Sequence, residues 1–200
     1  MTPKPFAPAC ERNRDPILGV LRTRFADRRH VLEIGSGTGQ HAVYFAAALP
    51  HLTWQTSERP EHLAGLRQWL DEARLSNTPP PLALDVGAAW PGGPFDAVFS
   101  ANTLHIMSWP EVETFFASLP LVCTNDAKLA VYGPFNYGGA FTSQSNAEFD
   151  RSLKSRDARM GIRDVAAVDA LACRAGFALL EDAAMPANNR CLVWQRGPIG

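Results

Sequence analysis

Short runs of apolar residues alternate along this chain of 200 residues with longer stretches in which apolar residues recur every three or four positions. The alternation indicates an α/β fold with a mostly parallel sheet and helices on both faces, and the last two runs indicate an antiparallel C-terminal hairpin. The short runs predict strands at residues 31–34, 52–56, 82–84, 95–100, 128–132, 177–180 and 191–195. The periodic stretches predict helices at residues 16–26, 42–49, 60–74, 111–121, 147–156 and 165–175.

Prolines and glycines mark where these elements should begin and end. Three prolines in the first eight residues predict an extended arm, and Asp15-Pro16 is typical of a helix N-cap followed by the first helical position. Gly133-Pro134 predicts the end of a strand. Residues 135–146 are rich in Gly, Ser, Thr and Asn, and they predict a loop over a site.

The length and charge of the chain narrow the class of protein. Two hundred residues without a linker or repeat suit one domain at 1–200, with a core at 28–200 and an arm and first helix at 1–27 that cover the site. The 19 basic and 20 acidic residues give a net charge of −1. A chain without a basic surplus lacks the electrostatic signature of binding to nucleic acid or to an anionic membrane, so we expect neither partner.

The cysteines and the N-terminus indicate a cellular compartment. Four cysteines stand far apart with no C-x-x-C pair, at Cys10, Cys123, Cys173 and Cys191. This spacing argues against a zinc site or a disulfide scaffold, so we expect no metal and a reducing environment. The N-terminus lacks the apolar segment of a signal peptide, and no run approaches the roughly 20 apolar residues of a membrane helix. We therefore expect a cytoplasmic soluble protein.

The glycine-rich stretch after the first strand carries the strongest chemical signal. Residues 31–41 read Val-Leu-Glu-Ile-Gly-Ser-Gly-Thr-Gly-Gln-His, a strand, a loop with the spacing E-x-G-x-G-x-G and the start of a helix. Glycine allows a sharp turn and a close approach of the backbone to a ligand. The dinucleotide pattern G-x-G-x-x-G would need glycine at position 40, where this chain has Gln40. The loop instead resembles motif I of the class I S-adenosylmethionine methyltransferases, and an NAD oxidoreductase remains the alternative at the level of the fold.

Polar residues also end the next three strands. Ligands of such folds bind at the carboxyl ends of the strands. Glu58 could accept two hydrogen bonds from a ribose diol, and Asp85 could accept one from an adenine amino group while the Val86 N–H donates to the ring. Each also has a structural interpretation, Glu58 as a helix-start residue and Asp85 as a turn residue. The fourth strand ends in Ser100-Ala-Asn-Thr-Leu-His105, without the D/N-P-P-Y/F signature of amide and adenine N-methyltransferases.

Six blocks of the sequence together resemble the DUF938 group, which includes methyltransferase-like protein 26. They lie at residues 8–17, 31–45, 132–136, 141–146, 161–164 and 185–189. The resemblance implies a Rossmann-like class I methyltransferase fold and S-adenosylmethionine as the methyl donor. It carries the cofactor site onto the glycine loop, onto Glu58, where relatives usually have Asp, and onto the ends of the third and fourth strands. The cofactor site that we predict comprises Glu33, Gly35, Ser36, Gly37, Gly39, Gln40, His41, Glu58, Asp85, Val86 and Asn102.

The residues that contact the acceptor are predicted from polar blocks that a fold alone would not require. Our hypothesis is that the N-terminal arm folds over the donor methyl and supplies Arg12 and Asn13, with Arg12 able to pair with a carboxylate or phosphate. His105 and Tyr132 are candidates for a base or a substrate orienter. The structural alternatives are a solvated helix start at Arg12, a packed aromatic at Tyr132 and a type I′ turn at Asn188-Asn189. The predicted catalytic residues are His105, Tyr132, Arg12 and Asn13, and the predicted substrate-binding residues are Arg12, Asn13, Tyr132, Phe135 and Asn188.

These observations favour a methyltransferase that acts on a small molecule, with an anionic acceptor among the options. Methyl transfer is an in-line displacement that depends on alignment, and it needs a base only if the nucleophile carries a proton. The sequence leaves O, N and S acceptors open, as well as the oligomeric state. The alternatives are a protein methyltransferase, which would need a more open groove, and a non-catalytic module that binds S-adenosylmethionine.

Overall fold

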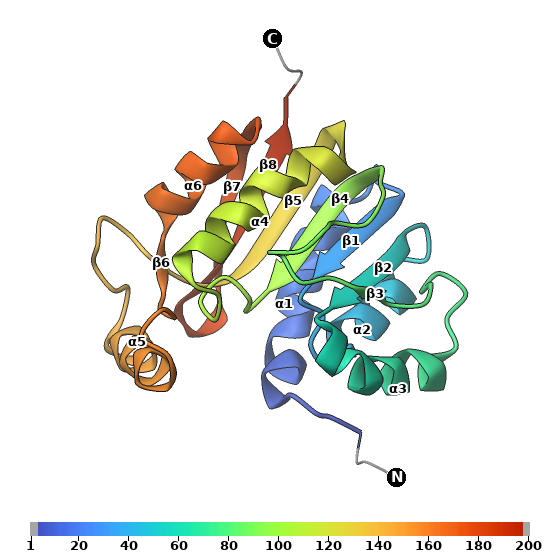
Figure 1. Ribbon diagram of the computed structural model, residues 1–200, viewed down its shortest axis with the longest axis horizontal. Helices are drawn as coiled ribbons and strands as arrows, with labels where there is room; N and C mark the ends of the chain where they lie inside the picture. Colours follow the sequence, from blue (N-terminus) through green and yellow to red (C-terminus); the bar gives the residue numbers. More distant parts are fainter. Residues whose placement is uncertain (1–3, 198–200) are drawn as a thin grey trace.

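The computed structural model describes residues 4–197 and has the α/β fold that the sequence predicts, with one twisted sheet between two layers of helices (Figure 1). The strands are β1 (His30–Ile34), β2 (Thr53–Glu58), β3 (Leu82–Ala83), β4 (Phe95–Ala101), β5 (Cys123–Asn136), β6 (Arg163–Asp164), β7 (Phe177–Met185) and β8 (Asn189–Arg196). The helices are α1 (Pro8–Arg24), α2 (Gln40–Ala48), α3 (Leu63–Ala73), α4 (Trp109–Val122), α5 (Gln144–Arg156) and α6 (Val165–Arg174), with short 3₁₀ turns at Pro60–His62 and Pro186–Asn188.

The order of the strands in the sheet is β3-β2-β1-β4-β5-β8-β7. The pairs from β3 to β5 are parallel, while β8 is antiparallel to β5 and β7 is antiparallel to β8. The predicted parallel sheet and antiparallel C-terminal hairpin are therefore confirmed. Because β1 lies between β2 and β4, the carboxyl ends of these three strands meet at one edge, where the switch in strand order makes room for a ligand.

Both faces of the sheet are covered, and the alternation of side chains along a strand explains the two cores. Val31 points to one face and packs with residues of α1, α2 and α3, including Phe45. Leu32 points to the opposite face and packs with α4 and α6, including Phe115 and Val168. In residues 4–197 we find no helix with both the length and the apolar character needed to cross a bilayer.

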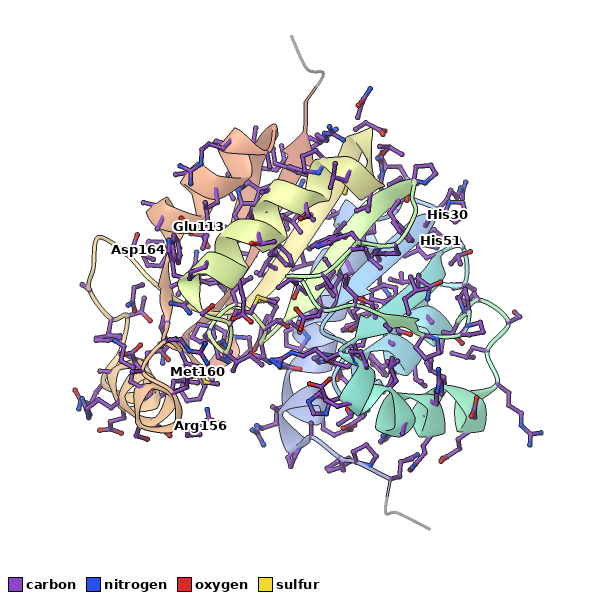
Figure 2. The ribbon with its side chains drawn as sticks, in the orientation of Figure 1. His30, His51, Glu113, Arg156, Met160 and Asp164 are labelled. Carbon is purple, nitrogen blue, oxygen red and sulfur yellow. The ribbon has the colours of Figure 1, made fainter. Side chains whose placement is uncertain are left out.

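Two histidines lie far from the edge of the sheet at which the parallel strands end. His30 opens β1 and His51 precedes β2, so both lie at the amino-terminal edge of the sheet, away from the ends that bind ligands (Figure 2). The His51 ring is 3.2 Å from the Phe25 carbonyl, a structural contact. The other three histidines, His41, His62 and His105, follow the carboxyl ends of β1, β2 and β4.

The first helix is longer than predicted. α1 begins at Pro8, not at Pro16, so Asp15-Pro16 lies inside the helix and the prediction of an N-cap there is wrong. Pro8 fits the first turn because the N–H that proline lacks has no partner in that turn. Asp15 instead accepts a hydrogen bond from the Tyr44 hydroxyl of α2. Arg12 and Asn13, which were predicted to lie in an N-terminal arm, therefore belong to helix α1.

The fifth strand does not stop at Gly133-Pro134, as the sequence predicts, but continues to Asn136. Pairing with β4 ends at Tyr132, and Pro134 lies opposite Asn189 of β8. Past Tyr132 one side of β5 has no β4 residue to receive a backbone N–H, so a proline is tolerated there. Phe135 and Asn136 therefore belong to the sheet, paired with β6, a strand that the sequence did not predict.

The predicted loop at residues 135–146 is correspondingly shorter, because α5 begins at Gln144. The Ser143 hydroxyl accepts a hydrogen bond from the Asn146 N–H and caps this helix. The terminal hairpin is also longer on both strands than predicted.

Candidate functional site

The glycine loop lies between the end of β1 and the start of α2, and its glycines have positive φ angles. The values are 73° at Gly35, 55° at Gly37 and 92° at Gly39. A Cβ on Gly35 would lie 2.8 Å from the Thr103 side chain, and a Cβ on Gly39 would lie 2.6 Å from Leu66. Gly37 would meet no atom within 4 Å. Gly35 and Gly39 are therefore required both by their backbone conformation and by the closeness of neighbouring side chains. Gly37 is favoured by its backbone conformation alone.

Glu33 lies beneath this loop rather than in front of it, with only 1% of its surface exposed. Its Oε2 accepts hydrogen bonds from Trp54 Nε1 and from Ser36 Oγ, both at 3.0 Å. The Ser57 N–H in turn donates to Ser36 Oγ at 3.2 Å. Burial raises the pKa of Glu33 to about 7, because the charged form loses its hydration. The hydrogen bonds from Trp54 and Ser36 lower this pKa, and the nearby Glu58 raises it. Glu33 thus supports the loop from inside the core.

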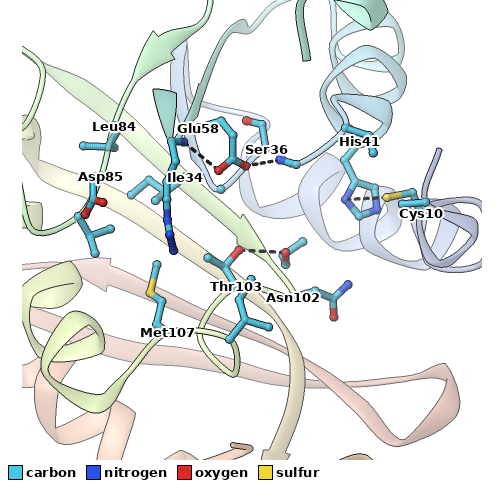
Figure 3. Close-up of a pocket in the computed structure, with 18 of the residues that line it drawn as sticks. Cys10, Ile34, Ser36, His41, Glu58, Leu84, Asp85, Asn102, Thr103 and Met107 are labelled. Atoms are coloured by element: carbon cyan, nitrogen blue, oxygen red, sulfur yellow. Dashed lines mark hydrogen bonds between the residues drawn. The ribbon is translucent and has the colours of Figure 1, made fainter. Parts of the chain in front are cut away.

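A first cavity of about 320 Å³ opens in front of the loop (Figure 3). Most of the predicted cofactor residues line it, and Glu33, Gly39 and Gln40 do not. The first helix was predicted to cover the site, but the residues by which it lines the cavity, and the apolar side of the cavity, were not predicted. The predicted residues in the lining are Gly35, Ser36, Gly37, His41, Glu58, Asp85, Val86 and Asn102. The lining residues that were not predicted are Ala7, Ala9, Cys10, Ile34, Thr38, Arg59, Leu84, Ala101, Thr103, Ile106, Met107 and Glu111.

The two acidic residues predicted for ribose and adenine stand on neighbouring strand ends of this cavity. Glu58 Oε2 accepts from the Gly37 N–H at 2.6 Å, and its Oε1 accepts from the Arg59 N–H at 2.9 Å. Asp85 Oδ1 accepts from the Gly87 N–H at 2.9 Å, which forms a local turn. Each carboxylate oxygen has two lone pairs, so both side chains can accept further hydrogen bonds from a ligand.

Hydrogen bonds fix the segment before α1, and the first turn of α1, against α2 and α3. The Ala7 N–H donates to Gln40 Oε1 at 2.6 Å, and Gln40 Nε2 donates to Glu11 at 3.2 Å. Trp69 Nε1 donates to the Pro5 carbonyl at 2.7 Å. Gln40 therefore anchors the N-terminal segment and does not line the cavity, although it was predicted as a cofactor residue.

His41 connects the wall of the first cavity to α1. Its Nε2 lies 2.7 Å from Asn13 Oδ1, and its Nδ1 lies 3.9 Å from Cys10 Sγ. Burial, with a smaller effect of Arg14, lowers the pKa of His41 to about 4, so the ring is neutral at pH 7. A neutral ring that donates from Nε2 to Asn13 presents its unprotonated Nδ1 to the Cys10 thiol.

A second cavity of about 580 Å³ is also lined by α1 and shares Ala9 and Asn102 with the first. Asn102 has φ of 57°, unusual outside glycine, and its N–H donates to the Tyr132 carbonyl at 2.8 Å. The cavity therefore adjoins the first at the ends of β4 and β5. Its lining consists of Ala9, Arg12, Asn13, Asn102, Tyr132, Pro134, Ser145, Asn146, Phe149, Pro186, Ala187 and Asn189.

Two residues predicted to bind substrate do not line this cavity. Phe135 is 2% exposed and packs in the core against α4 and α6, because β5 continues through it. Asn188 offers its backbone carbonyl to Asn146, while the neighbouring Ala187 and Asn189 line the cavity. Positive φ angles at Ala187 and Asn188 show that the tight turn is centred one residue earlier than the predicted Asn188-Asn189.

The two candidates for a base differ in position. Tyr132 lines the second cavity, and burial raises its pKa while the Asn13 side chain opposes this rise. His105 lines neither cavity. Its ring packs edge-to-face on Phe149 with centroids 5.2 Å apart, and burial together with Arg163 and Arg156 lowers its pKa to about 4.

Several solved structures with the same fold are methyltransferases. An O-methyltransferase family protein from Burkholderia thailandensis is 18% identical, with a TM-score of 0.81 over 93% of this chain and 57% of its own. The S-adenosylmethionine-dependent methyltransferase SibL, in its apo form, is 21% identical, with a TM-score of 0.79 over 94% of this chain and 56% of its own. An O-methyltransferase family 2 protein from Planctomyces limnophilus, in complex with apigenin, is 14% identical, with a TM-score of 0.79 over 92% and 56%.

These likenesses confirm the Rossmann-like methyltransferase fold. The chain spans a little over half the length of these three proteins. Residues 4–196 match a family described as "Protein of unknown function (DUF938)". The match covers nearly the whole chain, and the protein therefore belongs to the DUF938 family.

Proposed function

We propose that this protein transfers a methyl group from S-adenosylmethionine, bound in the first cavity, to a small-molecule acceptor bound in the second. The observation that carries the proposal is the common border of the two cavities at Ala9 and Asn102. A displacement reaction needs donor and acceptor in line and in contact. Two cavities that meet at one point, one of them at the glycine loop of a methyltransferase fold, provide that arrangement.

The residues of the first cavity fit S-adenosylmethionine, which supplies an electrophilic methyl group on a sulfonium when it is bound. Glu58 holds the ribose hydroxyls, and Asp85 with the Val86 N–H holds the adenine edge. Leu84 and Met107, both in the lining, provide apolar surface for the adenine ring. The loop backbone can come close to the ligand at Gly37, because no protein atom lies within 4 Å of the place that a Cβ would take. Glu33, Gly39 and Gln40 position the loop and the N-terminal segment without touching the ligand.

Arg12 gives the acceptor site its charge preference. It lines the second cavity, and among residues 4–197 no carboxylate lies within ion-pair distance of it. The neighbouring Arg14, by contrast, pairs with Glu11 at 2.6 Å and lies over the Tyr44 ring. A guanidinium without a partner at the wall of a cavity favours an acceptor with a carboxylate or phosphate group, which it can bind with two hydrogen bonds.

The experiment has a binding step and a transfer step. Calorimetric titration should show that S-adenosylmethionine binds and that NAD does not, and preferential binding of NAD would refute the proposal. The protein is then incubated with methyl-labelled S-adenosylmethionine and a cell extract separated into a low-molecular-weight filtrate and a protein fraction. Label should appear in the filtrate. Label only in the protein fraction would favour a protein methyltransferase, and binding without any transfer would favour a non-catalytic module.

A further inference from the structure

The polar side chains around the second cavity are a guanidinium, several amides, a phenol and a hydroxyl, and among the described residues no carboxylate lines it. The amides are partly committed to the protein. Asn146 Nδ2 donates to Thr142 Oγ1 at 2.9 Å and to the Asn188 carbonyl at 3.2 Å, and Asn13 Oδ1 is occupied by His41. Neither an amide nor a guanidinium accepts a proton at neutral pH. These groups can bind an acceptor, but they cannot ionise it.

Three titratable groups at or near the cavity, Tyr132, His105 and His41, are also poorly suited to act as a base there. Tyr132 is 3% exposed, and burial raises its pKa, so its hydroxyl stays protonated and serves as a donor. His105 packs against Phe149, outside the lining, and burial, with smaller effects of Arg163 and Arg156, lowers its pKa to about 4 and makes it a weak base. His41 donates from Nε2 to Asn13, and its other nitrogen faces Cys10 on the side of the first cavity.

We propose that the nucleophilic atom of the acceptor enters the second cavity already ionised, as a carboxylate or a thiolate, and that Arg12 selects this anionic class. The inference rests on the function proposed above. A lone pair of the anion forms the bond to the methyl carbon, the carbon–sulfur bond of the methyl sulfonium breaks, and its electron pair remains on the departing thioether. No proton has to leave the acceptor, which agrees with the groups in the cavity.

The walls of the cavity favour this pairing of charges. Pro134, Phe149 and Pro186 give the second cavity apolar surface. An anion that displaces water from this surface loses part of its hydration, and its attraction to a sulfonium cation strengthens as water is excluded between them. The two charges cancel during transfer, so the displacement of water by the bound acceptor favours the transition state over the separated ions. A neutral alcohol would gain nothing from this effect and would still have to lose its proton.

The test uses two matched pairs of probes with the full chain and saturating S-adenosylmethionine. Benzoate is compared with benzyl alcohol, and thiophenol with phenol, with S-adenosylhomocysteine formation as the readout. We expect turnover with benzoate or thiophenol at least about tenfold above that of the matched neutral probe, since a charge-assisted hydrogen bond separates the members of each pair. The two anionic arms distinguish a carboxylate acceptor from a thiolate acceptor.

A second readout does not depend on turnover. Calorimetric titration of the protein with the preferred anion, without donor, should show binding that Arg12→Gln weakens at least about tenfold. Arg14→Gln is the matched control, because Arg14 is paired with Glu11 and lines neither cavity, and it should bind like the parent protein. His105→Gln should keep the preference for the anion, whereas loss of turnover with a change in pH profile would identify His105 as a base.

The outcomes separate the two proposals. If S-adenosylmethionine does not bind, the function proposed above fails. If it binds and the neutral probe of a pair is methylated as fast as the anion, the present inference is wrong while the methyltransferase assignment stands. Binding of the donor with no turnover on any of the four probes, or anion binding that Arg12→Gln leaves unchanged, would also overturn the inference.

Discussion

The imidazole of His41 and the side-chain carbonyl of Asn13, 2.7 Å apart, join helix α2 to helix α1. His41 lines the first cavity and Asn13 lines the second. The hydrogen bond therefore crosses the boundary between the two proposed ligand sites. Because His41 donates from Nε2, the Asn13 oxygen is occupied and its amide hydrogens are directed elsewhere, toward Tyr132 or an acceptor.

Asn13→Ala should destabilise the protein by about 1–3 kcal/mol, because the buried Nε2–H of His41 would lose its partner. Urea unfolding followed by circular dichroism measures the change. Asn13→Asp is the control, since it keeps an oxygen in reach of the imidazole and should retain more of the stability. If Asn13→Ala unfolds at the same urea concentration as the parent protein, the pair contributes no net stability and the structural role assigned to it is wrong.

Gly35→Ala should abolish binding of S-adenosylmethionine. The new methyl group would lie 2.8 Å from the Thr103 side chain at a φ of 73°, so both a steric clash and backbone strain oppose it. Gly37→Ala has only the strain, about 1–2 kcal/mol, and should bind more weakly but measurably. Calorimetry compares the two.

The clash at Gly35 can be tested separately from the strain. Adding Thr103→Ala to Gly35→Ala removes the two atoms that lie 2.8 Å from the new methyl group. The double variant should therefore regain part of the lost affinity. Equal affinities of the single and double variants would show that backbone strain alone accounts for the loss.

Glu58→Ala should weaken S-adenosylmethionine binding by about tenfold or more, because it removes the acceptor for the ribose and the hydrogen bond to the Gly37 N–H. The stability of the protein should change little, since Glu58 is only partly buried. Glu61→Ala, three residues away and exposed, is the matched control and should leave the affinity unchanged. Equal affinities in the two variants would remove Glu58 from the cofactor site.

The strands other than β6, the glycine loop and the acidic strand ends could be predicted because their signals are local. Strand ends follow from apolar runs, and the parallel topology then places Glu58, Asp85 and Asn102 at one edge. The second cavity could not be predicted, because α1, β5, α5 and the terminal hairpin all contribute to it. Phe135 was misplaced for a local reason, since Gly133-Pro134 is typical of a strand end and the pairing with β8 overrides it.

The roles of His105 and His41 could not be predicted from the sequence either, because they depend on contacts between distant segments. His105 was predicted as catalytic because it follows β4, yet its ring packs against Phe149, outside the lining. His41 was predicted only as a cofactor residue, and its partner Asn13 is 28 positions away in the sequence. One signal could have suggested the pairing: Cys10 and Asn13 are three residues apart, so on a helix that began before Pro16 they would share a face. Because the residues before Pro16 were predicted to be extended, this shared face was not predicted.

The buried carboxyl of Glu33 predicts an unusual dependence of stability on pH. Its pKa is about 7 in the folded protein, against 4.5 for an unperturbed glutamate. Between these values the unfolded chain has lost its proton while the folded protein keeps it, so the contribution of this group to stability is fully present below pH 4.5 and falls as the pH rises toward 7. The loss amounts to about 3 kcal/mol over this range.

Glu33→Gln keeps a side-chain oxygen for Trp54 and Ser36 and removes the titration. Carboxylates distant from Glu33 titrate equally in both proteins, so the difference in unfolding free energy between Glu33→Gln and the parent reports on Glu33 and on its coupling to Glu58. Urea unfolding at several pH values from about 4.5 to 8 should show the variant gaining relative to the parent as the pH rises, with little further change above the folded-state pKa. A difference that stays constant with pH would mean that the Glu33 pKa is not raised, and that the carboxylate beneath the glycine loop is charged throughout this range.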